Sequence, residues 1–191
     1  MTPEDAAPAK KAVFLDRDGT INVNPPSGDF CKRVEDMRLL PGVASALKRM
    51  TDAGYVAVVF SNQSGVGRGY MTQRDVDDVN ARMRELLAAE GVTLAGVYIC
   101  PHVDEDNCEC RKPKPGLLVR GAREIGIDLA RSWAVGDSAR DVEAAQAAGC
   151  RTILVYGNAY PGQREKAEAL HPVASVESLT EAADIILDAS E

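Results

Sequence analysis

Short, continuously apolar runs alternate with amphipathic stretches along most of the chain. The run at residues 55–60, Tyr-Val-Ala-Val-Val-Phe, has no charged member, which is typical of a strand covered by helices on both faces. It ends in a polar run at residues 61–65. The predicted strands are residues 13–15, 55–60, 97–99, 133–135 and 152–155.

Between these runs, apolar residues recur at steps of three and four, the periodicity of a helix with one buried face. Thr72 is a suitable cap for the longest such stretch, and Gly91 follows its end. The predicted helices are residues 43–53, 73–90, 116–125, 140–148 and 179–187. Strands that alternate with helices predict an α/β fold with a doubly wound parallel sheet.

The chain has 191 residues, which suits one domain whose core needs no disulfides. Residues 1–11 are rich in proline, alanine and charge, so we expect a flexible leader followed by a single domain at residues 12–191. No segment is apolar over the ~18 residues of a membrane span. The net charge of −7 disfavours binding to nucleic acid. We therefore expect a cytoplasmic monomer with neither a membrane nor nucleic acid as a partner.

Polar residues follow the predicted strands where each strand ends. Asp16 and Asp18 follow the first strand, Ser61 and Asn62 the second, and Asp137 the fourth. Parallel sheets bind ligands beyond the carboxyl ends of their strands, so we expect these side chains to converge. Taken alone, Asp16 and Asp18 fit a solvated turn equally well. The convergence of several polar clusters favours a catalytic site.

The second carboxylate pair, Asp137 and Asp141, is separated by about one helical turn. The alternative for Asp137 is a simple cap of the helix that follows. We expect Asp141 to support the site by orienting Lys112 or a metal-bound water.

These residue types suit phosphoryl transfer. Asp16 can attack phosphorus and form an aspartyl-phosphate, while Asp18 donates a proton to the leaving group and later accepts one from water. Mg²⁺ held by Asp16, Asp137 and the backbone carbonyl of Asp18 would draw charge from the phosphate. Lys112 and Arg111 would offset the remaining negative charge, although their segment also fits a solvated basic loop. The sequence thus indicates a Mg²⁺-dependent phosphatase acting on a small phosphorylated substrate.

Four metal-ligating side chains crowd into eleven positions after the third predicted strand: Cys100, His102, Cys108 and Cys110. Three thiolates and one imidazole complete a tetrahedral Zn²⁺ site without a water position, so this zinc would be structural. The spacing is tighter than is usual, and the alternative is four unligated residues. Because Cys110 directly precedes Arg111, zinc would anchor the segment that carries both phosphate-binding cations.

The segments 16–20, 61–62 and 136–137, together with Lys112, resemble in residue type and order the four motifs of the haloacid dehalogenase (HAD) superfamily of Mg²⁺ phosphatases. Within it, residues 62–65 with 68–69, the cysteine–histidine loop and residues 111–113 resemble the heptose bisphosphate phosphatases. The resemblance implies a HAD-like domain that removes the 7-phosphate of D-glycero-D-manno-heptose 1,7-bisphosphate. It also implies Mg²⁺ as the catalytic cofactor and Zn²⁺ as a structural one.

The resemblance implies roles for individual residues. Asp16 would be the nucleophile and Asp18 the proton donor, while Ser61 and Lys112 stabilise the transferred phosphoryl group. The family pattern has an acid where this chain has Asn24. The implied substrate-binding residues are Asn24, Pro25, Pro26, Ser27, Ser61, Asn62, Gln63, Ser64, Arg111 and Lys112.

Three other functions compete with this prediction. A histidinol-phosphate phosphatase shares the fold and the zinc loop, and a polynucleotide 3′-phosphatase shares the architecture without a lid. A zinc-stabilised binding module without turnover is the non-enzymatic alternative. Only about 25 residues separate the first predicted strand from the first predicted helix, too few for a lid domain, so we expect an open site without a large cap.

Overall fold

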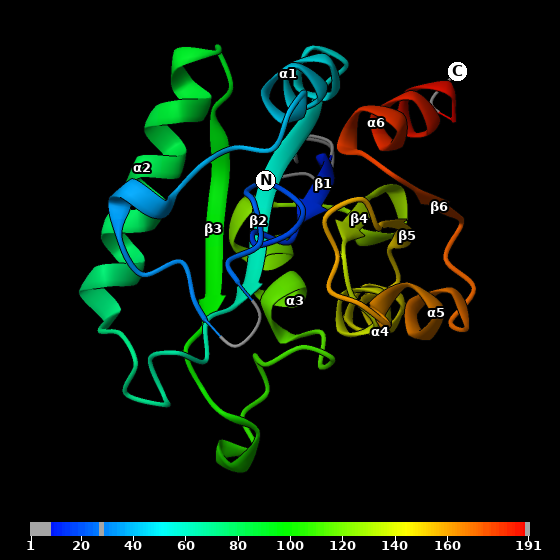
Figure 1. The fold of residues 1–191 in the computed structure, drawn as a ribbon. Coiled ribbons are helices and arrows are strands. Elements are labelled where there is room, and N and C mark those ends of the chain that lie inside the picture. Colours follow the sequence, from blue (N-terminus) through cyan, green and yellow to red (C-terminus); the bar gives the residue numbers. More distant parts are fainter. Residues whose placement is uncertain (1–8, 27–28, 190–191) are drawn as a thin grey trace, which may run out of the picture.

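The computed structural model describes residues 9–26 and 29–189. In this part of the chain, six parallel strands form one sheet in the order β3-β2-β1-β4-β5-β6 (Figure 1). The strands are β1 (Lys11–Leu15), β2 (Tyr55–Asn62), β3 (Leu94–Cys100), β4 (Trp133–Gly136), β5 (Arg151–Val155) and β6 (Ala174–Val176). The helices are α1 (Val43–Asp52), α2 (Gln73–Ala89), α3 (Gly116–Ile125), α4 (Ala139–Ala148), α5 (Gln163–Glu168) and α6 (Leu179–Asp188).

The predicted α/β class, the five predicted strands and the five predicted helices are confirmed, with one strand and one α-helix added. The prediction missed β6, which has only three residues, and α5, which has six. Both are too short for a periodic pattern, and α5 buries a single residue, Ala167. Regular structure begins before residue 12, the expected start of the domain, because Lys11 is the first residue of β1 and Lys10 bridges to Ile127. Residues 1–8 lie outside the described part.

Two apolar layers hold the sheet, one on each face. Val13 and Leu15 pack with the buried faces of α1, α2 and α6, whereas Ala12 and Phe14 pack with α3 and α4. This alternation follows from the two-residue period of a strand. β1 is apolar on both sides and pairs with β2 and β4, so it lies in the middle of the sheet with both faces covered.

The order of the strands in the sheet determines where the candidate site lies. The chain runs from β1 outward to β2 and β3, returns to β4 on the other side of β1, and then continues outward to β6. The direction therefore reverses between β1 and β4, the point where open α/β sheets form a ligand crevice beyond the carboxyl ends of their strands. Asp16 follows β1 and Asp137 follows β4 at this point. No helix within residues 9–26 and 29–189 is long and apolar enough to cross a membrane.

Candidate active site

Three carboxylates and one lysine form a buried cluster at the β1–β4 crevice. Asp16 comes from the end of β1, Asp137 from the end of β4 and Asp141 from the first turn of α4. One carboxylate oxygen of each lies within 4.8 Å of the others. Lys112, from the segment before α3, is 3 % exposed and lies among them. Four residues far apart in the sequence are thus brought together.

Lys112 uses all three of its ammonium protons inside this cluster. Its Nζ donates to Asp16 Oδ1 at 2.7 Å, to Asp141 Oδ1 at 2.5 Å and to the carbonyl oxygen of Phe60 at 3.0 Å. Burial lowers the pKa of Lys112, but the two carboxylates raise it further, so the net pKa is raised and the lysine is charged. The contact with Asp141 agrees with the expectation that Asp141 orients this lysine.

The backbone of Lys112 is fixed by Asn62 at the end of β2. The Asn62 side chain donates to the Lys112 carbonyl and accepts from its amide nitrogen, both at 3.1 Å. Asn62, expected to bind substrate, therefore also holds the lysine segment against the sheet.

The crowding of acids raises their pKa values. Burial, opposed by Lys112 and reinforced by Asp141, raises the pKa of Asp16 to about 6. Burial, reinforced by Asp16 and Asp141, raises the pKa of Asp137 to about 8. Such a site gains most from a divalent cation, and carboxylate oxygens are the ligands that Mg²⁺ prefers. The donor set therefore fits Mg²⁺.

Gly19 makes room for this arrangement. Its φ of +87° is in the left-handed region, and a Cβ there would overlap both the Asp137 carboxylate and the side-chain amide of Asn24. Asn24 in turn donates to Asp137 Oδ2 at 2.9 Å and to the carbonyl of Asn158 at 2.7 Å. An acid at position 24, as in the family pattern, could not donate these two hydrogen bonds.

Asp18 faces a different set of partners from Asp16. Its carboxylate accepts from Arg17 Nη2 at 3.0 Å, from Asn22 Nδ2 at 2.9 Å and from Gln63 Nε2 at 2.9 Å. Burial raises the pKa of Asp18, but the Arg17 guanidinium and these hydrogen bonds lower it further, and the net pKa is below its usual value. Asp18 is thus an ionised, fixed carboxylate at the edge of the site.

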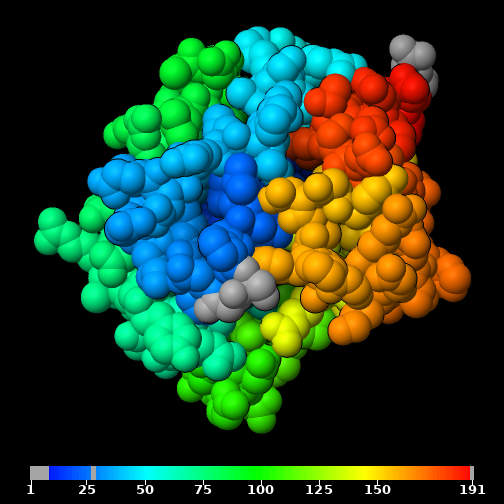
Figure 2. All heavy atoms as spheres, in the orientation of Figure 1, coloured from blue at the N-terminus to red at the C-terminus, as the bar shows by residue number. Residues whose placement is uncertain are grey.

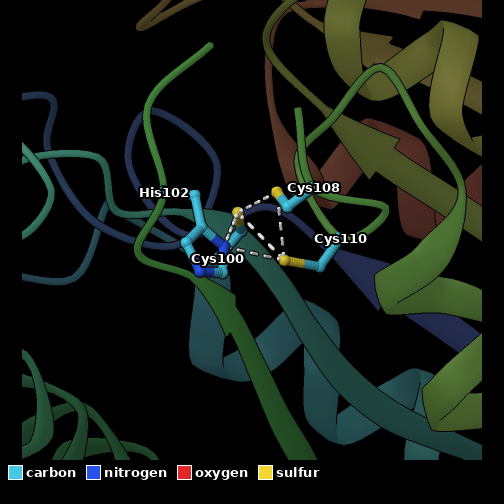
Figure 3. A group of neighbouring side chains, drawn as sticks. All are labelled: Cys100, His102, Cys108 and Cys110. Carbon is cyan, nitrogen blue, oxygen red and sulfur yellow. Dashed lines mark hydrogen bonds between the residues drawn. The ribbon is translucent and has the colours of Figure 1, made fainter. Parts of the chain in front are cut away.

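The cysteine–histidine loop closes into a compact cluster between β3 and α3 (Figure 3). The five measured separations among the three Sγ atoms and His102 Nδ1 are between 3.2 and 3.6 Å. Ligands around a tetrahedral Zn²⁺ lie about 3.5–3.8 Å apart, given Zn–S bonds near 2.3 Å. The four side chains therefore fit a structural zinc ion, as the spacing predicted.

Arg111 connects this zinc-binding loop (residues 100–110) to the site. Its Nε and Nη2 bind the Asp104 carboxylate at 2.7 and 3.3 Å, and its Nη1 donates to the carbonyl of His102 at 3.1 Å. Arg111 is buried and lines the same cavity as Asp16, Lys112 and Asp137. The loop thus fixes the orientation of this guanidinium.

A cavity of about 510 Å³ opens over the carboxylate cluster. Among the residues expected to bind substrate, it is lined by Asn24, Pro25, Ser61, Asn62, Ser64, Arg111 and Lys112. Gln63 is fully buried and does not line this cavity, because its side chain holds Ser61 and Asp18. Pro26 lines a smaller neighbouring cavity, and Ser27 lies outside the described residues.

Sequence reasoning missed other lining residues on the far wall. Tyr160 lines the cavity and donates to the carbonyl of Pro25 at 2.6 Å. Asn158 accepts from the backbone amide of Asn24 at 2.6 Å. These bonds join the segment after β1 to the segment after β5, coloured blue and gold where they meet in Figure 2. Arg140 and Lys166 also line the cavity. Arg140 lies on the predicted helix α4 and Lys166 on the missed helix α5, and positive charge was their only sequence signal.

This combination of a doubly wound sheet, an aspartate pair after β1 and a lysine–aspartate cluster beside it defines a HAD-type hydrolase. Residues 109–182 match the model of the HAD-hydrolase-like family. The D-glycero-β-D-manno-heptose-1,7-bisphosphate 7-phosphatase of Pseudomonas aeruginosa is 40% identical over 147 residues, covering 77% of this chain and 82% of that protein. The same enzyme of Haemophilus ducreyi is 40% identical over 166 residues, covering 82% and 90%.

Solved structures agree with the sequence comparison. A D,D-heptose 1,7-bisphosphate phosphatase from B. bronchiseptica, complexed with magnesium and phosphate, has a TM-score of 0.83 and 35% identity, covering 94% of this chain and 99% of that one. The Burkholderia thailandensis enzyme has a TM-score of 0.68 and 31% identity, covering 93% and 99%. The chain belongs to the D-glycero-β-D-manno-heptose-1,7-bisphosphate 7-phosphatase family of the HAD superfamily.

Proposed function

We propose that this protein is a Mg²⁺-dependent phosphatase that hydrolyses the 7-phosphate of D-glycero-D-manno-heptose 1,7-bisphosphate and leaves heptose 1-phosphate. The names of the relatives favour the β anomer as substrate. The observation that carries the proposal is the lysine bridge: Lys112 joins Asp16 to Asp141, beside Asp137, at the floor of a cavity large enough for a sugar phosphate.

Mg²⁺ would be held by Asp16, Asp137 and the backbone carbonyl of Asp18, with Asp141 close enough to contribute. When bound, it would neutralise charge on the transferred phosphate and so favour attack by a carboxylate. In this proposal Zn²⁺ bound by Cys100, His102, Cys108 and Cys110 has no catalytic task and fixes the loop that carries Arg111.

The proposed reaction starts at Asp16. Its carboxylate oxygen attacks phosphorus, the bond to the 7-oxygen of the sugar breaks, and an aspartyl-phosphate forms. In this step the Ser61 hydroxyl donates to the phosphoryl oxygens, and Lys112 donates to them in place of its hydrogen bond to the attacking Asp16. Water then attacks the intermediate, releases phosphate and regenerates the Asp16 carboxylate.

Asp18 handles the proton in both steps. Its carboxylate is ionised in the free protein, so it is ready to accept a proton from the attacking water. For the first step it must be protonated, and the negative charge of a bound phosphate raises its pKa in that direction. The proton then passes to the leaving sugar oxygen.

A phosphate-release assay tests this proposal. The purified protein is given heptose 1,7-bisphosphate with and without Mg²⁺, and histidinol phosphate serves as the competing substrate. We expect Mg²⁺-dependent release from the heptose ester and a loss of at least about 10³-fold in Asp16→Asn, which keeps the shape of the side chain but removes the nucleophile. Unchanged release from the Asp16→Asn protein would refute the mechanism, and a preference for histidinol phosphate would refute the substrate.

We further propose that the enzyme works as a cytoplasmic monomer, since one chain supplies every residue assigned to the cavity. Light scattering coupled to size-exclusion chromatography tests the monomer, and cell fractionation tests the location.

A further inference from the structure

Lys112 and Arg111, the two cationic residues identified from the sequence, already form ion pairs with carboxylates of the protein. Lys112 donates its three ammonium protons to Asp16, Asp141 and a carbonyl, all at the end of the cavity where the carboxylates cluster. Arg111 is bound through two nitrogens to Asp104 and through the third to a carbonyl. The second phosphate of a bisphosphate brings about two further negative charges to the cavity, and the charges of Lys112 and Arg111 are already partly offset by these carboxylates.

Two other cations line the same cavity and have little internal compensation. The side chain of Arg140, in the first turn of α4, is 54% exposed, and with the described residues it forms one ion pair, a long one of 3.9 Å to Asp104. Lys166 on α5 is exposed, and within the described residues it has no ion pair. The helices α4 and α5 pack side by side, so both cations belong to one wall of the cavity (Figure 1).

The guanidinium groups of Arg111 and Arg140, which both line the cavity, already face one oxyanion, the carboxylate of Asp104. It accepts from Arg111 at 2.7 Å and lies 3.9 Å from Arg140, so the two guanidinium groups approach the same carboxylate from different elements. Asp104 itself is more than half exposed, and its surroundings are rich enough in arginine to lower its pKa.

We propose that Arg140 and Lys166 bind the phosphate group that is not cleaved and thereby set the preference for a sugar bisphosphate over a monophosphate. The inference rests on the proposed function, because it concerns the second phosphate of the same substrate. Both side chains act on binding of the distal end only, since among the described residues neither has a hydrogen bond or ion pair with the carboxylates of Asp16, Asp137 and Asp141. Their loss therefore raises KM for the bisphosphate and leaves the chemistry at Asp16 intact.

The test compares two substrates that differ only in the distal phosphate: heptose 1,7-bisphosphate and heptose 7-phosphate. The variants are Arg140→Gln, Lys166→Gln and the double variant. Arg164→Gln is the matched control, because Arg164 is an exposed cation on the same helix as Lys166, pairs with Glu168 and does not line the cavity.

We expect each single substitution to lower kcat/KM for the bisphosphate by roughly 5- to 30-fold, through KM, and to change the value for the monophosphate less than about twofold. The double variant should treat the two substrates nearly alike, and inhibition by the product heptose 1-phosphate should weaken in parallel. Arg164→Gln should behave as wild type.

The two possible failures are distinguishable. If the wild-type protein hydrolyses neither heptose ester, the proposed function fails and this inference falls with it. If the wild-type protein hydrolyses both without preference, or prefers the bisphosphate and keeps that preference in the double variant, the inference alone is wrong.

Discussion

Asp137→Asn should make the protein more stable in the absence of Mg²⁺ and at alkaline pH. Asp137 is buried beside two further carboxylates, and its pKa is raised to about 8 chiefly by burial and by Asp16. An asparagine has nearly the same shape, and its oxygen can still accept the hydrogen bond from Asn24. The substitution therefore removes a buried negative charge without leaving a cavity.

The magnitude follows from the pKa. A carboxyl group that titrates at 3.8 when unfolded and at about 8 when folded opposes folding increasingly as the pH rises between these values, and by a constant amount above them. At 1.36 kcal/mol per pH unit this bounds the cost at roughly 5–6 kcal/mol. Neighbouring groups reorient around the ionised carboxylate, so we expect a gain of about 2–4 kcal/mol at pH 8.5 and about a third of that at pH 5.

Urea denaturation of wild-type and Asp137→Asn protein measures this gain. The buffers are freed of Mg²⁺ by a resin before the zinc-loaded protein is added, since a soluble chelator would also remove zinc. Added Mg²⁺ should then stabilise the wild type and leave the variant unchanged. A variant that is equal to or less stable than the wild type at pH 8.5 without Mg²⁺ would refute the electrostatic reasoning.

Three further predictions follow from the same geometry. The apparent affinity for Mg²⁺ should rise roughly tenfold to hundredfold between pH 6 and pH 8, because Asp137 must lose its proton to bind the ion. Isothermal titration calorimetry checks this, and an affinity that does not change with pH would contradict it. Cys110→Ser should lower the zinc content, as metal analysis measures, and raise KM roughly tenfold or more in steady-state kinetics, because Arg111 is released. An unaltered KM in zinc-free protein would count against a link between zinc binding and the position of Arg111. Gly116→Ala should cost about 1–3 kcal/mol of stability, because a Cβ would overlap the backbone of the zinc-binding loop; an unchanged urea midpoint would show that the loop yields freely.

The elements that bury long apolar faces could be predicted from the sequence. The predicted bounds of α3 agree with the structure, and α2 begins after its expected cap, Thr72, whose side chain accepts from the Asp75 amide. The missed α5 has one buried residue, and the missed β6 has one residue buried in the sheet. The conformation of such short elements depends on packing against neighbouring elements, and the pattern of apolar residues in their own sequence carries little information.

Site residues could be predicted from the sequence where they directly follow a strand, because function restricts the residue type at that position. Asp16 and Asp137 follow this rule, and the structure brings them together with Lys112, which lies in the segment before α3. Tyr160 and Asn158 obey no such rule. They reach the cavity because the segment after β5 folds back over the segment after β1, a contact between residues more than 130 positions apart. Hydrogen bonds of this kind depend on tertiary geometry that no local spacing encodes.

Charge balance explains why the far wall of the cavity matters as much as its floor. With a divalent cation in place, the three carboxylates Asp16, Asp137 and Asp141 are balanced by that cation and by Lys112. The neighbouring ionised Asp18 is balanced by Arg17. The catalytic end is then neutral before substrate arrives, so it stabilises a phosphate through aligned donors and exerts little attraction at a distance. A substrate with negative charge at both ends is drawn in by cations that the protein has left uncompensated, and among the described residues that line the cavity these lie on α4 and α5.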